Sequence, residues 1–110
     1  MKTYYDPDDL PHFSDMGKHR PELWQKFKQY HDAVLADGAL SEREKALIAL
    51  AVAHAVQCAY CIDAYTQSSL RAGADLDQMT EAVHVAAAVR GGSSLVHGVQ
   101  MRAVVEKLGM

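Results

Sequence analysis

The chain has 110 residues, of which 11 are Lys or Arg and 14 are Asp or Glu, so its formal net charge is −3. This length predicts one compact domain, and a composition of 49% hydrophobic and 23% charged residues excludes a disordered chain. The slightly acidic charge, without any cluster of Lys and Arg, argues against a nucleic acid or an anionic membrane as partner.

An arm and a first helix are predicted for the beginning of the chain. Residues 1–20 hold two prolines and several aspartates, which favours an irregular arm with one short helix over 10–16 that ends at Gly17. Pro21 suits the first position of a helix, and apolar side chains at helical spacing follow it until Gly38 stops the helix.

The next predicted helix, over 42–56, is apolar on every side. Ser41 and Glu44 form the sequence pattern of a capping box at its start. The apolar residues behind them are Leu47, Ile48, Leu50, Ala51, Val52 and Val56. Such a helix must be buried all round, but a lone domain of this size buries only roughly 60–70% of its unfolded surface. We therefore expect a partner subunit to cover part of this helix, and predict a homo-oligomer.

Further helices are predicted for the second half of the chain. One helix over 59–72 stops at Gly73, and Asp75 caps the next. The Gly91-Gly92 pair is expected to break that helix, and a last helix follows over 93–108. No stretch alternates with period two for long enough to form a strand. The predicted fold class is all-α, with about five to six helices in a single domain over 1–110.

The sequence predicts a cytoplasmic protein without a membrane span. Its longest uncharged apolar run, over 46–56, already contains His54 and is well short of the roughly 20 residues that a span needs. The chain turns acidic at Asp6, where a signal peptide would have its apolar segment. In a reducing cytosol, two cysteines are expected to be catalytic or metal-binding rather than a structural cross-link.

Cys58 and Cys61 are the only cysteines, and they lie at the start of a predicted helix. Their spacing brings the sulfurs close enough for a disulfide, while the unpaired N–H groups and the macrodipole favour thiolate over thiol. A thiolate nucleophile with a resolving partner beside it is what a two-cysteine redox site requires. Metal binding and inert packing are the alternatives. Because two cysteines rarely fall at this spacing by chance, we favour redox chemistry.

The candidates for proton exchange with the pair are His54, Tyr65, His84 and Glu44. His54 lies four residues before the first cysteine and Tyr65 four after the second, a spacing that shares a helix face. Each histidine of an apolar stretch is either functional or a core residue with a satisfied hydrogen bond. A phenol with a pKa of about 10 donates a proton at neutral pH rather than accepting one. The remaining histidines, expected to be surface or packing residues, are His12, His19, His31 and His97.

Several stretches carry a family resemblance: Leu47 to Ala53, Cys58 to Ile62, Ala72 to Ala74, and Glu81 to Gly92. Together they resemble the carboxymuconolactone decarboxylase superfamily, specifically its alkylhydroperoxidase D (AhpD-like) branch, over residues 40–98. Within that branch, residues 43–97 are most similar to the small peroxidase-like proteins associated with arsenosugar biosynthesis. The resemblance implies an all-helical protomer, homo-oligomers of three or six chains, and peroxidase or disulfide reductase activity without haem or flavin.

The resemblance also implies roles for both cysteines. In the family, the second cysteine forms the sulfenic acid and the first resolves it or donates a proton, which maps to Cys61 and Cys58. The family also has a Glu twelve residues before the first cysteine and a His four after the second, where this chain has Ala46 and Tyr65. Either proton transfer is rebuilt from His54, Tyr65, His84 or a displaced Glu44, or peroxidase activity is weak.

We therefore expect a thiol oxidoreductase without a bound cofactor, in which Cys61 attacks a hydroperoxide or an oxidised thiol. Cys58 would then close a disulfide that a thiol reductant reopens, with His54 as the base. A first alternative is a binding module that holds a soft ion such as Zn²⁺ or trivalent arsenic with both cysteines and one or both of His54 and His84. A second is lactone decarboxylation, the other chemistry of the superfamily, which leaves the cysteine pair unexplained.

Overall fold

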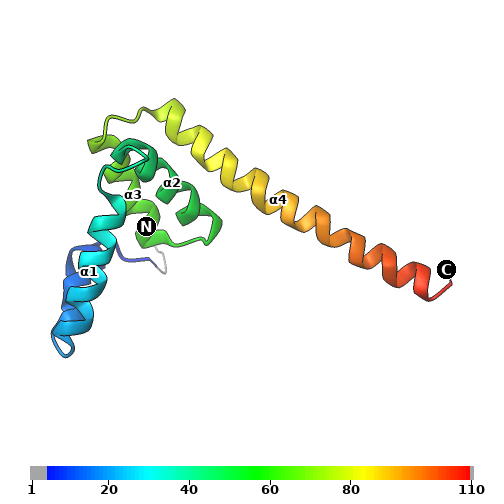
Figure 1. Cartoon of the computed structure of the whole chain (residues 1–110), viewed down its shortest axis with the longest axis horizontal. Helices are drawn as coiled ribbons and strands as arrows, with labels where there is room; N and C mark the ends of the chain where they lie inside the picture. Colours follow the sequence, from blue (N-terminus) through cyan, green and yellow to red (C-terminus); the bar gives the residue numbers. More distant parts are fainter. Residues whose placement is uncertain (1–4, 110) are drawn as a thin grey trace.

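The computed structural model describes residues 5–109, and every regular element in that part of the chain is a helix (Figure 1). The predicted all-α class is confirmed. The elements are the 3-10 helix η1 (Pro7–Gly17) and the α-helices α1 (Pro21–Leu35), α2 (Glu42–Ala55), α3 (Ala59–Arg71) and α4 (Leu76–Lys107). Residues 1–4 of the expected N-terminal arm lie outside the described part. None of the described helices is both long enough and apolar enough to cross a membrane.

Local sequence signals set the ends of the α-helices. At the start of α2, the Ser41 hydroxyl accepts a hydrogen bond from the Glu44 N–H, and the Glu44 carboxylate accepts one from the Ser41 N–H, which confirms the capping box. Asp75 and Gln78 form the same arrangement at the start of α4. After α3, Gly73 has a φ of +88°, a left-handed conformation that glycine adopts without a steric penalty.

The helical part of the arm is longer than expected. It ends at Gly17 as predicted but begins at Pro7, because the Asp6 side chain accepts a hydrogen bond from the Asp8 N–H and so caps it. Phe13 packs edge-on against Trp24 of α1, with ring centroids 4.9 Å apart. A Cβ atom at Gly17 would lie 2.9 Å from the Trp24 ring, so only glycine permits this close approach.

The small core lies where α2 packs against both α3 and α4. Leu50, Ala74 and Met79 form its buried cluster, with Leu47 and Tyr65 packed against them. In a single chain, however, one side of α2 is only partly covered: Ile48 is 50% exposed and Val52 is 54% exposed. One chain therefore does not meet the expectation that α2 is buried all round.

The expected break at Gly91-Gly92 is wrong, because α4 runs without interruption from Leu76 to Lys107. Glycine lowers helix stability by about 1 kcal/mol relative to Ala, but unlike proline it keeps its N–H and removes no hydrogen bond from the helix. The second half of α4 extends away from the other helices (Figure 1). The radius of gyration is accordingly 18.7 Å, against about 13 Å for a compact chain of 100 residues.

Candidate functional site

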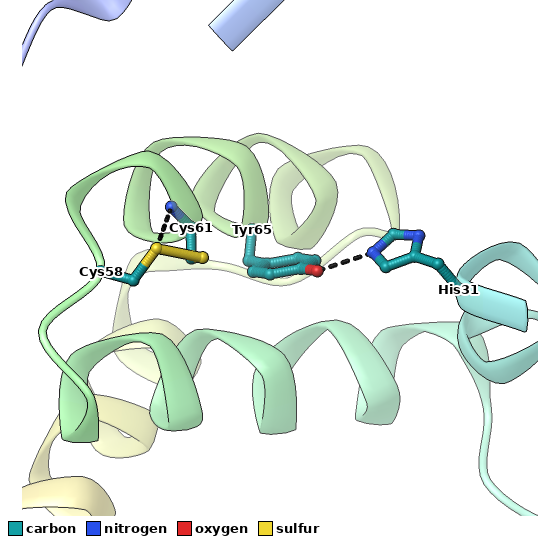
Figure 2. Close-up of a disulfide and its surroundings, with 4 residues drawn as sticks. All are labelled: His31, Cys58, Cys61 and Tyr65. Carbon is teal, nitrogen blue, oxygen red and sulfur yellow. Dashed lines mark hydrogen bonds between the residues drawn. A yellow bond between two sulfur atoms is a disulfide. The ribbon is translucent and has the colours of Figure 1, made fainter. Parts of the chain in front are cut away.

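The cysteine pair lies at the amino end of α3. Cys58 is the N-cap residue of the helix and Cys61 lies in its first turn, with Cα atoms 5.2 Å apart and the two sulfurs joined in a disulfide (Figure 2). The Cys61 N–H also donates a 3.2 Å hydrogen bond to the Cys58 sulfur. The predicted helix start and the predicted proximity of the two sulfurs are therefore both present.

The tight connection between α2 and α3 fixes this position. Gln57 has a φ of +55°, an uncommon conformation for a residue with a side chain. The next residue, Cys58, donates its N–H to the Ala53 carbonyl at 3.0 Å. This reversal brings the end of α2 against the start of α3, so the pair lies on a rigid helix junction rather than on a mobile loop.

The helix terminus favours negative charge on sulfur in the reduced protein. The N–H groups of the first turn have no partner within the helix, and the helix dipole places partial positive charge there. As the N-cap residue with an N–H aimed at its sulfur, Cys58 is positioned to become a stabilised thiolate.

Tyr65 follows the pair one helical turn later on α3. Its ring extends from the side of Cys61 toward α1, and its hydroxyl shares a 2.7 Å hydrogen bond with His31 Nε2 (Figure 2). The two rings stack with centroids 6.2 Å apart. Burial raises the pKa of Tyr65, so its phenol stays protonated at neutral pH.

His31 is the residue of this site that the sequence analysis missed. It lies 34 residues before Tyr65 and was expected to be a surface or packing residue. A usable signal was the spacing of Trp24, Phe27 and His31, which places three rings on one face of α1. That face turns toward η1 and α3, so the imidazole reaches the tyrosine.

Asp32 supports the imidazole from its other side. Its Oδ1 lies 3.4 Å from His31 Nδ1, and its Oδ2 accepts a 2.8 Å hydrogen bond from Lys28. The hydrogen bond from Lys28, followed by that from His31, lowers the pKa of Asp32. The carboxylate therefore stays ionised at neutral pH and can hold the orientation of the ring.

Two cavities reach the pair. The smaller, of about 480 Å³, lies between α1, α2 and α3 and is walled mainly by apolar side chains. The larger, of about 760 Å³, lies between η1, α1 and α3. Cys61 and Tyr65 border both cavities, whereas Cys58 and His31 border only the larger one. Cys61 can therefore be approached from either cavity, and Cys58 from the larger one.

The model of the Carboxymuconolactone decarboxylase family matches residues 21–101, which is well over half of the chain and includes the cysteine pair. The chain belongs to the carboxymuconolactone decarboxylase family. The superfamily that the sequence resembles is therefore confirmed, while the narrower resemblance to arsenosugar-associated proteins stays a prediction.

Three relatives illustrate the membership. An "Uncharacterized protein 4 in cox locus" of Paracoccus denitrificans is 44% identical over 75 residues, which cover 68% of each chain. A crystal structure of a protein from Methanobacterium thermoautotrophicum superposes with a TM-score of 0.73 at 36% identity, covering 76% of this chain and 94% of that one. An apo carboxymuconolactone decarboxylase family protein from Legionella pneumophila gives a TM-score of 0.71 at 30% identity, covering 94% and 92%.

The other proton-exchange candidates of this carboxymuconolactone decarboxylase family member lie outside both cavities. His54 Nδ1 donates a 2.8 Å hydrogen bond to the Leu50 carbonyl, the contact of a histidine satisfied within its own helix. Glu44 is engaged in the capping box, and eleven residues of helix separate it from the end of α2 by about 16 Å. His84 is exposed on α4. A relay role for these residues stays a prediction.

Residues 5–109 contain no set of side chains arranged to bind a metal ion. In that range, no three His, Cys, Asp or Glu side chains come close enough together to hold an ion. Neither His54 nor His84 joins the cysteines in such a group. The family's absent carboxylate position is taken by Ala46, which is buried in the packing of α2.

Proposed function

We propose that this protein is a thiol oxidoreductase that reduces hydroperoxides or oxidised thiols with Cys58 and Cys61. The observation that supports the proposal is the position of two sulfurs, close enough for a disulfide, at the amino end of a helix, where one cavity reaches both cysteines and a second reaches Cys61. An inert pair of small hydrophobes would need neither the helix terminus nor the access. We place the cycle in the cytoplasm, where thiol reductants are available.

The first step assigns attack to Cys61, the sulfur that borders both cavities. Its thiolate forms a bond to the terminal oxygen of a hydroperoxide while the O–O bond breaks, so that a sulfenic acid and an alcohol result. Cys58 then attacks the Cys61 sulfur and expels the hydroxyl, which leaves as water on protonation. The products are a disulfide and water, and the hydroperoxide has gained two electrons.

The return step uses the helix terminus. A reductant thiolate attacks the Cys61 sulfur through the cavities, and Cys58 leaves. A thiol of low pKa is the better leaving group, and the N-cap position is the one where the N–H groups and the dipole stabilise the thiolate of Cys58. A second reductant thiol releases Cys61 and completes a reductant disulfide.

Mass spectrometry of the reduced protein before and after addition of hydroperoxide tests the cycle. We expect the wild type to lose two hydrogens, Cys61→Ser to stay unchanged, and Cys58→Ser to accumulate a sulfenic acid that a dimedone probe labels. A Ser93→Ala variant, on the exposed part of α4, serves as control and should behave like the wild type. Labelling of Cys58 in Cys61→Ser, without any reaction of Cys61 in Cys58→Ser, would reverse the assigned order.

We also propose that the protein acts as a homo-oligomer, as the resemblance implies with three or six chains. Two surfaces support this. The side of α2 that lines the smaller cavity exposes Ile48, Val52 and Val56, and the second half of α4 exposes Leu95, Val96 and Val99. Contiguous apolar surface of this kind marks an interaction site in a folded protein, and burying it between copies would supply the area that one chain lacks.

A further inference from the structure

We propose that Tyr65 is the proton donor to the leaving oxygen of an organic hydroperoxide, and that His31 positions and recharges its hydroxyl. The inference rests on the proposed thiol chemistry and specifies its proton transfer and its substrate class. It assigns a function to His31, a residue of α1 that the sequence places far from the cysteine motif.

The geometry that carries the inference is a line of side chains that begins at the pair. Figure 2 shows the Tyr65 ring extending from Cys61, with its hydroxyl at the end of the ring that faces His31. The hydroxyl and His31 Nε2 are 2.7 Å apart, within hydrogen-bond range. Both side chains are partly buried and border the larger cavity together with both cysteines. The ring thus lies next to Cys61, and the hydroxyl lies at the end of the ring away from the reactive sulfur.

The separation of the Tyr65 hydroxyl from the Cys61 sulfur matches the arrangement of the two oxygens in a hydroperoxide. The sulfur bonds to the terminal oxygen, so the group that needs a proton is the next oxygen along, which leaves as an alkoxide. A general acid is most effective where charge develops on such a leaving group. A hydroxyl displaced from the sulfur in the direction of the cavity is placed for the leaving oxygen rather than for the thiol.

His31 can reprotonate Tyr65 after the phenol has donated its proton. Burial raises the pKa of Tyr65, so a phenolate left after proton donation would be a costly species in this environment. The imidazolium form of His31, with its Nε2–H at hydrogen-bond distance, supplies a proton to the phenol oxygen as the phenol gives up its own, and it becomes a neutral imidazole. Asp32, 3.4 Å from Nδ1, orients the ring for this transfer.

The step balances in atoms and electrons. The Cys61 thiol ionises, its sulfur forms the S–O bond, and the O–O bond breaks. The alkoxide takes the Tyr65 proton, Tyr65 takes one from His31, and His31 regains one from solvent, which received the proton of the thiol. The net change is thiol plus hydroperoxide to sulfenic acid plus alcohol, with sulfur oxidised and the peroxide oxygens reduced.

The walls of the larger cavity indicate an organic substrate. Leu10, Phe13 and Met16 of η1 and Leu35 of α1 give it an apolar side next to the pair. Its volume of about 760 Å³ far exceeds what two oxygen atoms occupy, and falls within the roughly 300–1,000 Å³ typical of sites for drug-sized ligands. Hydrogen peroxide would leave this apolar surface unused, whereas the carbon skeleton of an organic hydroperoxide covers it.

The experiment compares two oxidants that differ in the need for a proton. Stopped-flow oxidation of the reduced protein is followed with cumene hydroperoxide, whose alkoxide must be protonated, and with 5,5′-dithiobis(2-nitrobenzoate), whose aromatic thiolate leaves unprotonated. We expect Tyr65→Phe and His31→Gln each to slow the hydroperoxide reaction by at least about 100-fold, the low end of general acid catalysis. The disulfide reaction should change by less than threefold. The double variant should lose little more than the slower single variant, since both residues serve one transfer.

Tyr30→Phe and His19→Gln are the matched controls, because both residues are exposed and border neither cavity. Equal losses with both oxidants would overturn the inference and assign the pair a structural role. An unchanged hydroperoxide rate in Tyr65→Phe would overturn it as well, as would a wild type that reacts with the disulfide but not with cumene hydroperoxide. A wild type that reacts with neither oxidant would instead contradict the proposed function.

Discussion

The Tyr5 hydroxyl donates a 2.6 Å hydrogen bond to the Asp63 carboxylate, 58 residues further along the chain. A second contact runs parallel to it, because the Tyr60 hydroxyl donates a 2.7 Å hydrogen bond to Asp9. The rings of Tyr5 and Tyr60 also meet edge to face, with centroids 4.7 Å apart. These contacts join the N-terminal arm to the first turns of α3, so the arm forms one wall of the larger cavity beside the cysteine pair.

The attachment of the arm should depend on pH at both extremes. The hydrogen bond from Tyr5, followed by that from Gln67, lowers the pKa of Asp63, so its stabilisation is present at neutral pH and is lost as pH falls through this lowered value. The same bond raises the pKa of Tyr5 to about 12. The stabilisation from the phenol is therefore complete below its ordinary pKa of about 10 and is lost between about 10 and about 12.

Limited proteolysis of the arm across this pH range tests the prediction. We expect the cleavage rate of the wild type to rise at acidic pH and again above about pH 10, where the Tyr5 phenol of a released arm begins to ionise. Tyr5→Phe should raise the rate at neutral pH and reduce the alkaline rise, leaving the part that comes from Tyr60 and its hydrogen bond to Asp9. Tyr30→Phe, on the exposed face of α1, is the control. A Tyr5→Phe profile identical to that of the wild type would show that the hydroxyl does not hold the arm.

Gly17→Ala should weaken the attachment of the arm because the added methyl group would collide with Trp24. A Cβ atom at this position would lie 2.9 Å from the Trp24 ring and 3.0 Å from the Trp24 Cβ, so the indole would have to move as a whole. Forcing an added methyl group into such a contact costs about 1–3 kcal/mol. Gly91→Ala, whose added Cβ meets no atom within 4 Å, should instead leave stability equal or higher. Thermal unfolding of both variants tests the prediction. Equal unfolding midpoints for Gly17→Ala and Gly91→Ala would contradict the close approach of Gly17 to Trp24.

Signals confined to neighbouring residues were readable from the sequence. The capping box of Ser41 and Glu44, the stop at Gly73 and the N-cap position of Cys58 each depend on a few adjacent residues, and each is present. The continuation of α4 was not readable, because a glycine pair weakens a helix without preventing it.

The pairing of His31 with Tyr65 could not be read in the same way. It depends on how η1 holds α1 relative to α3, through the packing of Phe13 of η1 against Trp24 and Phe27 of α1. Tertiary contacts of this kind leave only a weak trace in the sequence, here the ring spacing on α1. The proximity of the two sulfurs was predictable because the two cysteines are only three positions apart at the start of one helix.

Val96→Asp should dissociate the proposed homo-oligomer. Val96 is 63% exposed on the part of α4 that extends away from the core, and it continues a line of apolar residues through Val85, Val89 and Val99. A carboxylate buried there without a partner costs several kcal/mol. Light scattering at micromolar concentration should report an oligomer for the wild type and a monomer for the variant. Gln29→Asp, on the exposed face of α1, should remain oligomeric, and a monomeric wild type would refute the oligomer itself.

The His54→Gln variant tests whether His54 has a structural role or is the proton base that the sequence indicated. Because His54 Nδ1 donates to the Leu50 carbonyl and the side chain borders neither cavity, we expect a loss of about 0.5–1.5 kcal/mol of stability from the missing hydrogen bond. The pH dependence of cysteine alkylation should stay that of the wild type, whereas a base acting on the thiols would shift it. Chemical denaturation and iodoacetamide alkylation of the reduced protein provide both measurements. If the variant keeps its stability but its alkylation profile moves to higher pH, His54 activates the thiols, and Tyr65 with His31 is left to serve the leaving oxygen alone.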